Sequence, residues 1–545
     1  PYLSDNVSWD PNNLPISSIK IESVATTYKT LKKNVQYMTD YYDNGGAESI
    51  NQNVHVDHHN LGTIIDSDST FRIYLGTDGG IFYTNSSMDP GVVDNDFKVS
   101  GKSSNNWYQP AGGYNTTQFY GADKVVGYDQ YFGGSQDNGT FLSPRNQIAD
   151  ETTTWSFEIG GDGFEAIAHH TDPNKLIGGS QGNNFYRSTN GGASWNYAQY
   201  GLEGSDPFIT RLSSPFQDPD VLYAVTSFGV MKSNDFGQSW QAKQVEGNWS
   251  SSFWSGTDVE VSLANPRYIW AGSSMSTAGN IFLSKDWGET YESVPNFSNL
   301  GRTSGIYSHP TEDSTAYVLF GMPGAAKVLQ TKDLGETWED LSGFTNSTDG
   351  KSLNGFPDVP VYSFLVMPHN KDIMWAGTEV GLIESTDGGT SWHLVESNLP
   401  YVTIWDLKLK DEGQIVIATH GRGVWTATID DLKSYEPKPA ILPPFILSAY
   451  QLDSEDSYVI STNINIKSSY DSLIIKANNL QRDVFQNVDK SDSTNFVFEV
   501  DDKGDYTIQA FGYKDGLEHP SNEYDIILNP TLEPRTEYST TFSDL

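Results

Sequence analysis

Four carboxylates stand in or beside glycine-rich turns and could act as a chemical pair: Asp78, Asp137, Asp162 and Glu379. Hydrolysis of a glycosidic bond needs one carboxyl group as the acid and a second as the base or nucleophile. These residues are far apart in the sequence, so they could act together only if the fold gathered their turns. Aspartate in a glycine-rich turn also serves the turn's own hydrogen bonds. A purely structural role is therefore the competing interpretation for each of them.

A second set of residues has the side chains that bind sugars. Aromatic rings and small polar groups bind the faces and hydroxyls of carbohydrates. The segment 246–255 holds two tryptophans and is the best candidate for a binding loop; the alternative is that the tryptophans pack between sheets. The candidate ligand-binding residues are Tyr114, Asn138, Trp249, Trp254, Arg302, Tyr401, Trp405, His420 and Arg422.

A histidine-rich run could hold a metal ion. On a strand, alternation would place His55, Asp57 and His59 on one face, with the end members roughly 13 Å apart. Two of them plus a residue from elsewhere could bind one ion, whereas the competing interpretation is hydrogen-bonded packing. Calcium stays open because carboxylates are abundant, although the sequence holds no EF-hand loop. We expect that no cofactor is required.

Composition excludes several classes of protein. The 545 residues include 70 Asp and Glu against 33 Lys and Arg, a net charge of -37, which disfavours binding to nucleic acid. The sequence has no cysteine, which excludes disulfide scaffolds, Cys-ligated metals and thiol catalysis. No apolar run is long enough to span a membrane.

Five copies of one pattern dominate the middle of the chain. Each has Ser or Thr, then Asp or Asn two residues later, then Gly, then an aromatic residue. We expect tight hairpin turns in which the Asp or Asn caps backbone N–H groups, the Gly has a positive φ and the aromatic ring packs between sheets. The capping residues are Asn190, Asp235, Asp286, Asp333 and Asp387.

Before each such turn lies a strand that ends in a glycine-rich turn, and together these units repeat about every 47 residues. Four short strands at this period are typical of a β-propeller blade. We therefore predict an all-β chain with a propeller over residues 54–432. Eight blades are favoured, seven or ten stay open, and residues 1–53 are expected to close the ring.

The pattern S/T-x-D-x-G-x-x-W, as in Thr331–Trp338, resembles the Asp box, or BNR repeat, of sortilins, xyloglucanases and sialidases. The combination of these repeats with an appended domain resembles multidomain proteins secreted by Bacteroidetes, including those of type IX secretion. The run Leu75–Gly80 resembles the segment of xyloglucanases whose Asp is catalytic, which would make Asp78 an acid or base. Those enzymes carry the second carboxylate on a second propeller, so here Asp137, Asp162 or Glu379 would have to supply it. The arginine triad of sialidases is not identifiable.

The remaining segments have different patterns. Residues 433–445 are rich in proline and predict a semi-rigid linker. Residues 446–530 alternate apolar and polar side chains between turns, which predicts an Ig- or fibronectin-like β-sandwich. Residues 531–545 are expected to lead into a further domain of the same polypeptide.

The predicted propeller indicates which of the candidate residues lie on the same face. If the four strands of a blade are A to D from the channel outwards, the B–C turns and the D–A connections emerge on one face. The candidate carboxylates and aromatic residues all belong to that set. We therefore expect an extracellular or cell-surface module that binds a glycan or an extracellular protein, with a polysaccharide-active hydrolase or lyase as the alternative.

Overall fold

The computed structural model describes two N-terminal pieces, 57–65 and 71–84, and most of 116–528, with gaps at 151, 205–206, 276–279, 299, 411–412 and 453–457 and several between 246 and 255. Short strand pairs before residue 109 are also described. The described part of the chain is all-β apart from a single 3-10 turn, Asp430–Ser434. In that part, no helix has the length and apolar character needed to cross a bilayer.

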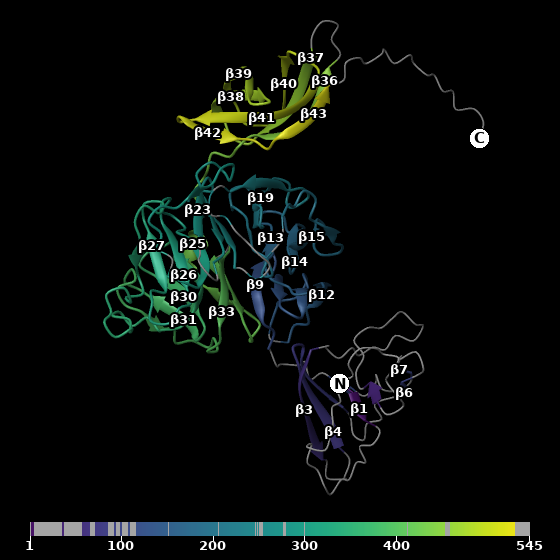
Figure 1. Cartoon of the computed structure of the whole chain (residues 1–545), viewed down its shortest axis with the longest axis vertical. Helices are drawn as coiled ribbons and strands as arrows, with labels where there is room; N and C mark the ends of the chain where they lie inside the picture. Colours follow the sequence, from purple (N-terminus) through teal and green to yellow (C-terminus); the bar gives the residue numbers. More distant parts are fainter. Residues whose placement is uncertain are drawn as a thin grey trace, which may run out of the picture.

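Seven antiparallel sheets of consecutive strands form the central body (Figure 1). The first three have four strands each: β9 (Phe119–Lys124), β10 (Tyr131–Ser135), β11 (Gly139–Leu142) and β12 (Ser156–Ile159); β13 (Ala166–Ala168), β14 (Leu176–Ser180), β15 (Asn184–Ser188) and β16 (Asn196–Tyr197); β17 (Leu212–Ser213), β18 (Leu222–Val225), β19 (Gly229–Ser233) and β20 (Gln241–Gln244).

The next three sheets also have four strands, and the last has three. They are β21 (Asp258–Val261), β22 (Ile269–Ser273), β23 (Asn280–Ser284) and β24 (Glu292–Ser293); β25 (Thr303–Ser308), β26 (Ala316–Phe320), β27 (Val328–Thr331) and β28 (Glu339–Asp340); β29 (Val361–Val366), β30 (Met374–Thr378), β31 (Gly381–Ser385) and β32 (His393–Leu394); β33 (Ile404–Leu409), β34 (Gln414–Thr419) and β35 (Val424–Thr428).

The first strands of these sheets line a common axis and close a ring. Each packs against the first strand of the next sheet, and β33 and β34 pack directly against β9. The N–H of Gly421 donates to Thr117 O at 3.2 Å, and Gln118 forms an isolated β-bridge with His420. This arrangement is a β-propeller in which seven described sheets surround the channel.

The favoured count of eight blades needs correction. The eighth sheet, of β3 (His58–Ile65), β4 (Phe71–Thr77), β5 (Gly80–Thr84) and β8 (Trp107–Tyr108), lies outside the ring (Figure 1). Because the last sheet contacts β9 directly, no space is left between them for another blade. Residues 1–53 were expected to close the ring, but apart from β1 (Tyr2–Ser4) and β2 (Val35–Tyr37) they lie outside the described residues.

The meander order gives the ring two faces. We call the face with the B–C turns and the D–A connections the BC face, and the face with the A–B and C–D turns the CD face. The candidate residues of the ring all lie in B–C turns, in D–A connections or at the adjoining strand ends. They therefore share the BC face although their sheets are separate in the sequence.

The five repeat turns lie on the CD face and share one hydrogen-bond pattern. In the second copy the Ser233 hydroxyl donates to Asp235 Oδ1 at 2.8 Å, and Asp235 Oδ1 accepts from the N–H of Ser239 at 2.9 Å. Gly237 has a φ of 76° and donates its N–H to Ser233 Oγ. The aromatic residue reaches the preceding sheet, where Trp240 Nε1 donates to Ala198 O at 2.8 Å. The turn therefore fixes both the hairpin and the spacing between blades.

Replacing Asp235 with alanine should lower the free energy of unfolding by about 1–2 kcal/mol, because the turn loses its capping acceptor. Denaturant unfolding would measure this loss. Asp235→Asn is the matched control: Asn190 fills the same position in the first copy and accepts from Ser188 Oγ and the Ser194 N–H, both at 2.9 Å. Equal losses for the two variants would refute the capping role.

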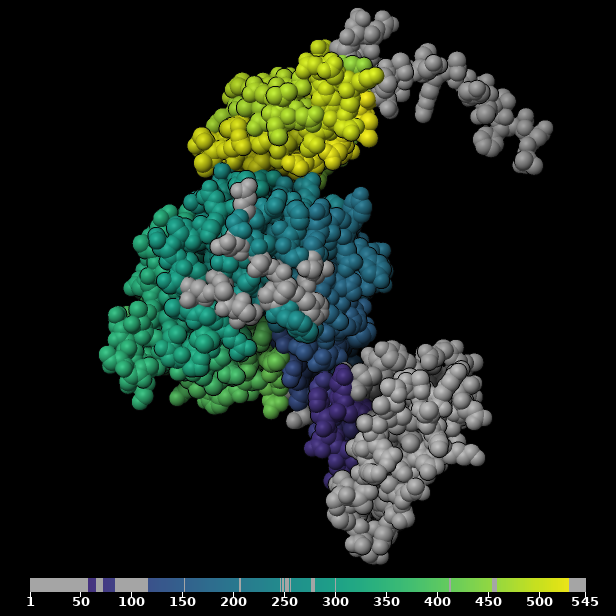
Figure 2. Space-filling model, in the orientation of Figure 1, coloured from purple at the N-terminus to yellow at the C-terminus, as the bar shows by residue number. Residues whose placement is uncertain are grey.

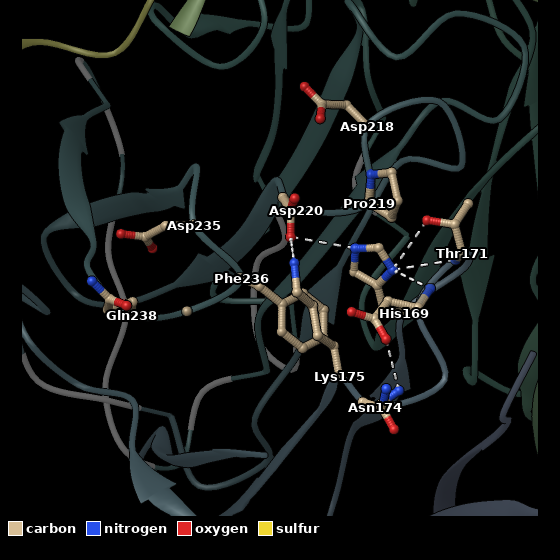
Figure 3. A network of polar contacts seen from close by, with 12 residues as sticks. His169, Thr171, Asn174, Lys175, Asp218, Pro219, Asp220, Asp235, Phe236 and Gln238 are labelled. Atoms are coloured by element: carbon tan, nitrogen blue, oxygen red, sulfur yellow. Dashed lines mark hydrogen bonds and ion pairs between the residues drawn. The ribbon is translucent and has the colours of Figure 1, made fainter. Parts of the chain in front are cut away.

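The polar network of the A–B turns is structural. His169 Nδ1 accepts from the N–H of Asp172 at 2.9 Å, while its Nε2 lies 3.3 Å from Asp220 of the next blade (Figure 3). Lys175 Nζ lies 2.5 Å from the same carboxylate. His309 repeats the turn, accepting from the N–H of Glu312 at 3.0 Å. These contacts join neighbouring blades and give His169 a structural role.

The C-terminal domain is a sandwich of two sheets. One contains β36 (Phe445–Leu452), β37 (Tyr458–Ile466) and β40 (Ser491–Val500). The other contains β39 (Leu480–Val488), β38 (Tyr470–Ala477), β41 (Gly504–Lys514) and β42 (Leu517–Pro520), and β43 (Tyr524–Leu528) also pairs with β41. Alternate residues of both sheets, including Ile460, Leu473 and Ile508, are fully buried between them.

The sandwich lies against the propeller (Figure 2), and its contacts belong to the CD face. Lys467 Nζ lies 2.7 Å from Asp218, and Lys438 Nζ lies 2.8 Å from Asp313. Trp287, in a repeat turn, donates its indole N–H to His519 Nδ1 at 3.3 Å. Burial and then the Arg267 charge lower the pKa of His519 to about 4, so its ring is neutral and can accept this bond. Part of the CD face is therefore covered by the chain itself.

Candidate functional site

The mouth of the channel on the BC face is lined by aromatic side chains from several blades. Trp405 stacks on Tyr362 with ring centroids 4.5 Å apart, and its other neighbour, Tyr120, lies at 4.3 Å. Tyr120 meets Phe164 edge to face at 5.0 Å. His420 lies beside both Tyr120 and Trp405. The mouth is therefore bordered by a continuous aromatic cluster, in which Tyr120 and Phe164 are buried and Tyr362 and Trp405 are partly exposed.

Polar atoms without partners accompany these rings. Trp405 Nε1 and His420 Nε2 are buried and make no hydrogen bond. Burial lowers the pKa of His420, so its ring is neutral near pH 7. Tyr120 donates its hydroxyl to Gln136 Oε1 at 2.6 Å. The mouth thus combines the partly exposed rings of Tyr362 and Trp405 with buried hydrogen-bonding atoms that have no partner.

Three of the four candidate catalytic carboxylates come together at one side of this mouth. Carboxylate oxygens of Asp57, Asp78 and Asp137 lie within 4.8 Å of one another. Asp162 joins them, since its Oδ1 accepts from the Asp137 N–H at 2.8 Å. Asn138 Nδ2 donates to Asp78 O at 3.1 Å, which ties the outer sheet to the ring. We call Asp57, Asp78, Asp137 and Asp162 the acidic cluster.

The acidic cluster changes the titration of its central member. Burial, followed by the charges of Asp162 and Asp78, raises the pKa of Asp137 to about 6. A carboxyl group with such a pKa can hold or release a proton near neutral pH, as a general acid does. Burial and then the Asp137 charge raise the pKa of Tyr120 to about 12, so its hydroxyl stays protonated.

The same oxygens are the donors that a hard cation would use. Asp57, Asp78 and Asp137 could supply carboxylate ligands to calcium or a similar ion. His59 forms a direct ring-to-carboxylate contact with Asp78. Of the predicted histidine-rich metal site, His55 lies outside the described residues, while Asp57 and His59 both approach Asp78.

The other candidates of the BC face lie apart from the acidic cluster. Glu379 is exposed in the β30–β31 turn, where its N–H donates to Pro360 O at 3.1 Å. Burial, followed by the Glu379 charge, raises the pKa of Tyr362, and the Arg302 charge partly offsets this rise. Tyr401 is 72% exposed. Arg422 is exposed, and its Nη1 donates to Gly421 O at 3.2 Å.

The two tryptophans of segment 246–255 have different roles. Trp249 is partly buried, with its ring 5.4 Å from Phe282 and its Nε1 donating to Thr226 O at 3.0 Å, so it packs between sheets. Trp254 is 76% exposed and rests on Phe208, with ring centroids 5.1 Å apart. Tyr114 lies outside the described residues. Only Trp254 of this pair presents its surface to a ligand.

A charged network inside the channel is absent from the sequence-based list of candidates. A cavity of about 140 Å³ is lined by first-strand side chains of most blades. Lys408 bonds Glu165, and Arg211 lies 3.7 Å from Glu165 and 3.9 Å from Asp258. Lys410 pairs with Asp123 at 2.7 Å. The alternation of charged and apolar residues in 406–410 is the pattern that could have revealed it.

No protein-family model and no curated protein matches the chain. Among solved structures, a GH74 enzyme of Niastella koreensis is 16% identical over 67% of this chain and 48% of its own, with a TM-score of 0.42. This chain thus spans about half the length of that enzyme.

Two further similarities are of the same kind. YCF48 from Cyanidioschyzon merolae is 13% identical over 57% of this chain and 95% of its own, with a TM-score of 0.39. The extracellular domain of a putative one-component system from B. thetaiotaomicron is 12% identical over 86% of this chain and 61% of its own, with a TM-score of 0.38.

Proposed function

We propose that this chain is a recognition module of a secreted or cell-surface protein and that it binds a glycan or a partner protein through the BC face of its propeller. The observation that carries the proposal is the gathering, at one channel mouth, of aromatic rings, unpartnered polar atoms and the acidic cluster. The sandwich occupies part of the CD face. The outer sheet meets the BC face beside Asn138, but Trp254, Tyr401 and Arg422 remain exposed on that face.

The domain assignments belong to the same proposal. We assign the repeat turns to the Asp-box class and propose an extracellular location, further domains in the same polypeptide and no role with nucleic acid. The sandwich is proposed to be Ig-like: its strand pairing divides the strands as in fibronectin-type domains, and Tyr506 donates its hydroxyl to Asp502 O at 2.8 Å, like the tyrosine corner.

Trp254→Ala should weaken ligand binding about tenfold and leave the melting temperature unchanged, because an exposed ring contributes contact area to a ligand and little to the core. A glycan array and a titration of any hit would measure this. Tyr197→Ala is the control, since Tyr197 is also exposed, at 71%, on an outer strand. Equal binding by wild type and Trp254→Ala would remove this part of the site.

A second function is favoured by one specific observation. The oxygens of Asp78 and Asp137 lie within 4.8 Å of each other, and the pKa of Asp137 is about 6. This is near the carboxyl separation of retaining glycosidases, about 5 Å. Reducing ends released from a bound glycan, and lost in Asp137→Asn, would establish a hydrolase; binding without release would leave the recognition module.

A further inference from the structure

Four exposed apolar side chains stand on the BC face of the third, fifth and sixth sheets of the ring. Phe228, Met322 and Val380 occupy B–C turns and are 37%, 39% and 41% exposed, and Tyr401 occupies the connection from β32 to β33. Turn apices in this position usually carry small polar residues. Scattered exposed apolar side chains, such as Phe228, are ordinary, but those of the adjacent fifth and sixth sheets and of the connection after β32 recur on one face, which marks an interaction surface.

These side chains lie close to polar residues already placed on the face. Tyr401 lies against the turn of Val380: a Cβ added to Gly381 would meet its Cδ1 at 3.6 Å. Met322 lies over Gly301, next to exposed Arg302, and Glu379 adjoins Val380. Met322, Val380 and Tyr401 therefore form one mixed surface with Arg302 and Glu379, whose charges both act on Tyr362 between them.

The types of these side chains distinguish between ligand classes. A sugar ring stacks on a flat aromatic face, which Met322 and Val380 lack. Methionine adapts its shape to apolar protein side chains, and Met and Tyr are among the residues enriched in protein–protein interfaces. This part of the BC face is thus better suited to a polypeptide than to a carbohydrate.

The charges indicate the sign of the partner. The acidic cluster and Glu379 outnumber the exposed Arg302 and Arg422 on this face, and the chain as a whole carries a net charge of -37. Acidic surfaces attract and orient basic partners by long-range electrostatics. The face is apolar near Val380 and Met322 and acidic near Asp78. It would therefore select a segment that has both apolar and basic side chains.

We propose that the partner of the BC face is a basic polypeptide segment that places apolar side chains against Met322, Val380 and Tyr401 and its Lys or Arg side chains against Glu379 and the acidic cluster. The inference rests on the proposed recognition function and assigns its ligand class.

The test uses a random 12-residue peptide library displayed on phage and selected on the immobilised full chain. We expect enriched sequences that combine Lys or Arg with apolar residues. Their synthetic forms should bind Met322→Ser/Val380→Ser about tenfold more weakly, and Glu379→Gln more weakly with a smaller salt dependence. Ile148→Ser is the matched control, since Ile148 is exposed in the loop between β11 and β12 on the CD face.

Three outcomes would overturn the inference. The first is a selection that enriches no sequence, and the second is a selection that enriches acidic sequences. The third is equal binding of the selected peptides to wild type and to the BC-face variants, because this would show a general attraction to an acidic protein. A parallel titration with the glycan array separates the two proposals. Glycan binding without peptide binding keeps the recognition function and removes the polypeptide partner, whereas the absence of both removes both.

Discussion

Glu165→Gln should destabilise the propeller by about 3–5 kcal/mol, because it leaves two buried cations without their shared partner. Glu165 is only 6% exposed, bonds Lys408 and lies 3.7 Å from Arg211. Burial lowers the pKa of Lys408, but the charges of Glu165 and Asp406 more than offset this and raise it above the usual range. Both cations would remain charged in the variant and would be poorly compensated.

Chemical denaturation, followed by tryptophan fluorescence, would measure this loss. The matched control is Glu339→Gln: Glu339 lies 3.9 Å from Lys332 in an exposed pair, which should contribute less than about 1 kcal/mol. If the two substitutions cost the same, the network inside the channel would not hold the blades together.

Stability should fall as the pH rises from about 5 to 9, and Glu260→Gln should remove much of this fall. Burial, opposed by hydrogen bonds from Ser308 and reinforced by the Asp258 charge, raises the pKa of Glu260 to about 8. A carboxyl group whose pKa is higher in the folded state binds a proton preferentially there. Its contribution is complete below the unfolded pKa, near 4.5, and is lost as the pH rises through about 8.

The size of this effect is about 2–4 kcal/mol. In Glu260→Gln, the new amide oxygen would keep an acceptor for the Ser308 N–H, 3.1 Å from the wild-type carboxylate, and for the Ser308 hydroxyl, 2.6 Å from it, without acquiring a charge. The variant should therefore match wild type at pH 5 and exceed its melting temperature at pH 8.5. Asp258 and Asp406, whose pKa values are raised to about 6, keep a smaller dependence between pH 4 and 6 in both proteins. Parallel melting curves at every pH would contradict this account.

Local chemistry explains how much of the fold could be predicted. The repeat turns are specified by contacts within eight residues, such as those from Asp235 to Ser233 and Ser239. Their spacing and the order of strands within each sheet follow from the same short-range pattern. The number of sheets in the ring does not, because closure depends on contacts between β33 and β9, whose sequences are far apart.

The candidate site shows the same division. Sequence reasoning chose Asp78, Asp137 and Asp162 because each belongs to a glycine-rich turn, and the fold brings the three together. It also proposed Trp249 for a ligand, whereas the structure packs that ring against Phe282. The sequence could not distinguish the exposed Trp254 from the packed Trp249, because the loop that holds both has no periodicity that would indicate which side chain is buried.

The sequence by itself determined the repeat, the all-β class, the turn chemistry and the acidic character of this protein, because these depend on residue type and on spacing within a few tens of residues. Only the tertiary structure decided that seven described sheets close the ring, that Lys408 and Arg211 share Glu165 inside the channel, and that Asp78 of an outer sheet meets Asp137 of the ring. Each of these depends on long-range packing, where burial and electrostatics act between residues that no local pattern relates.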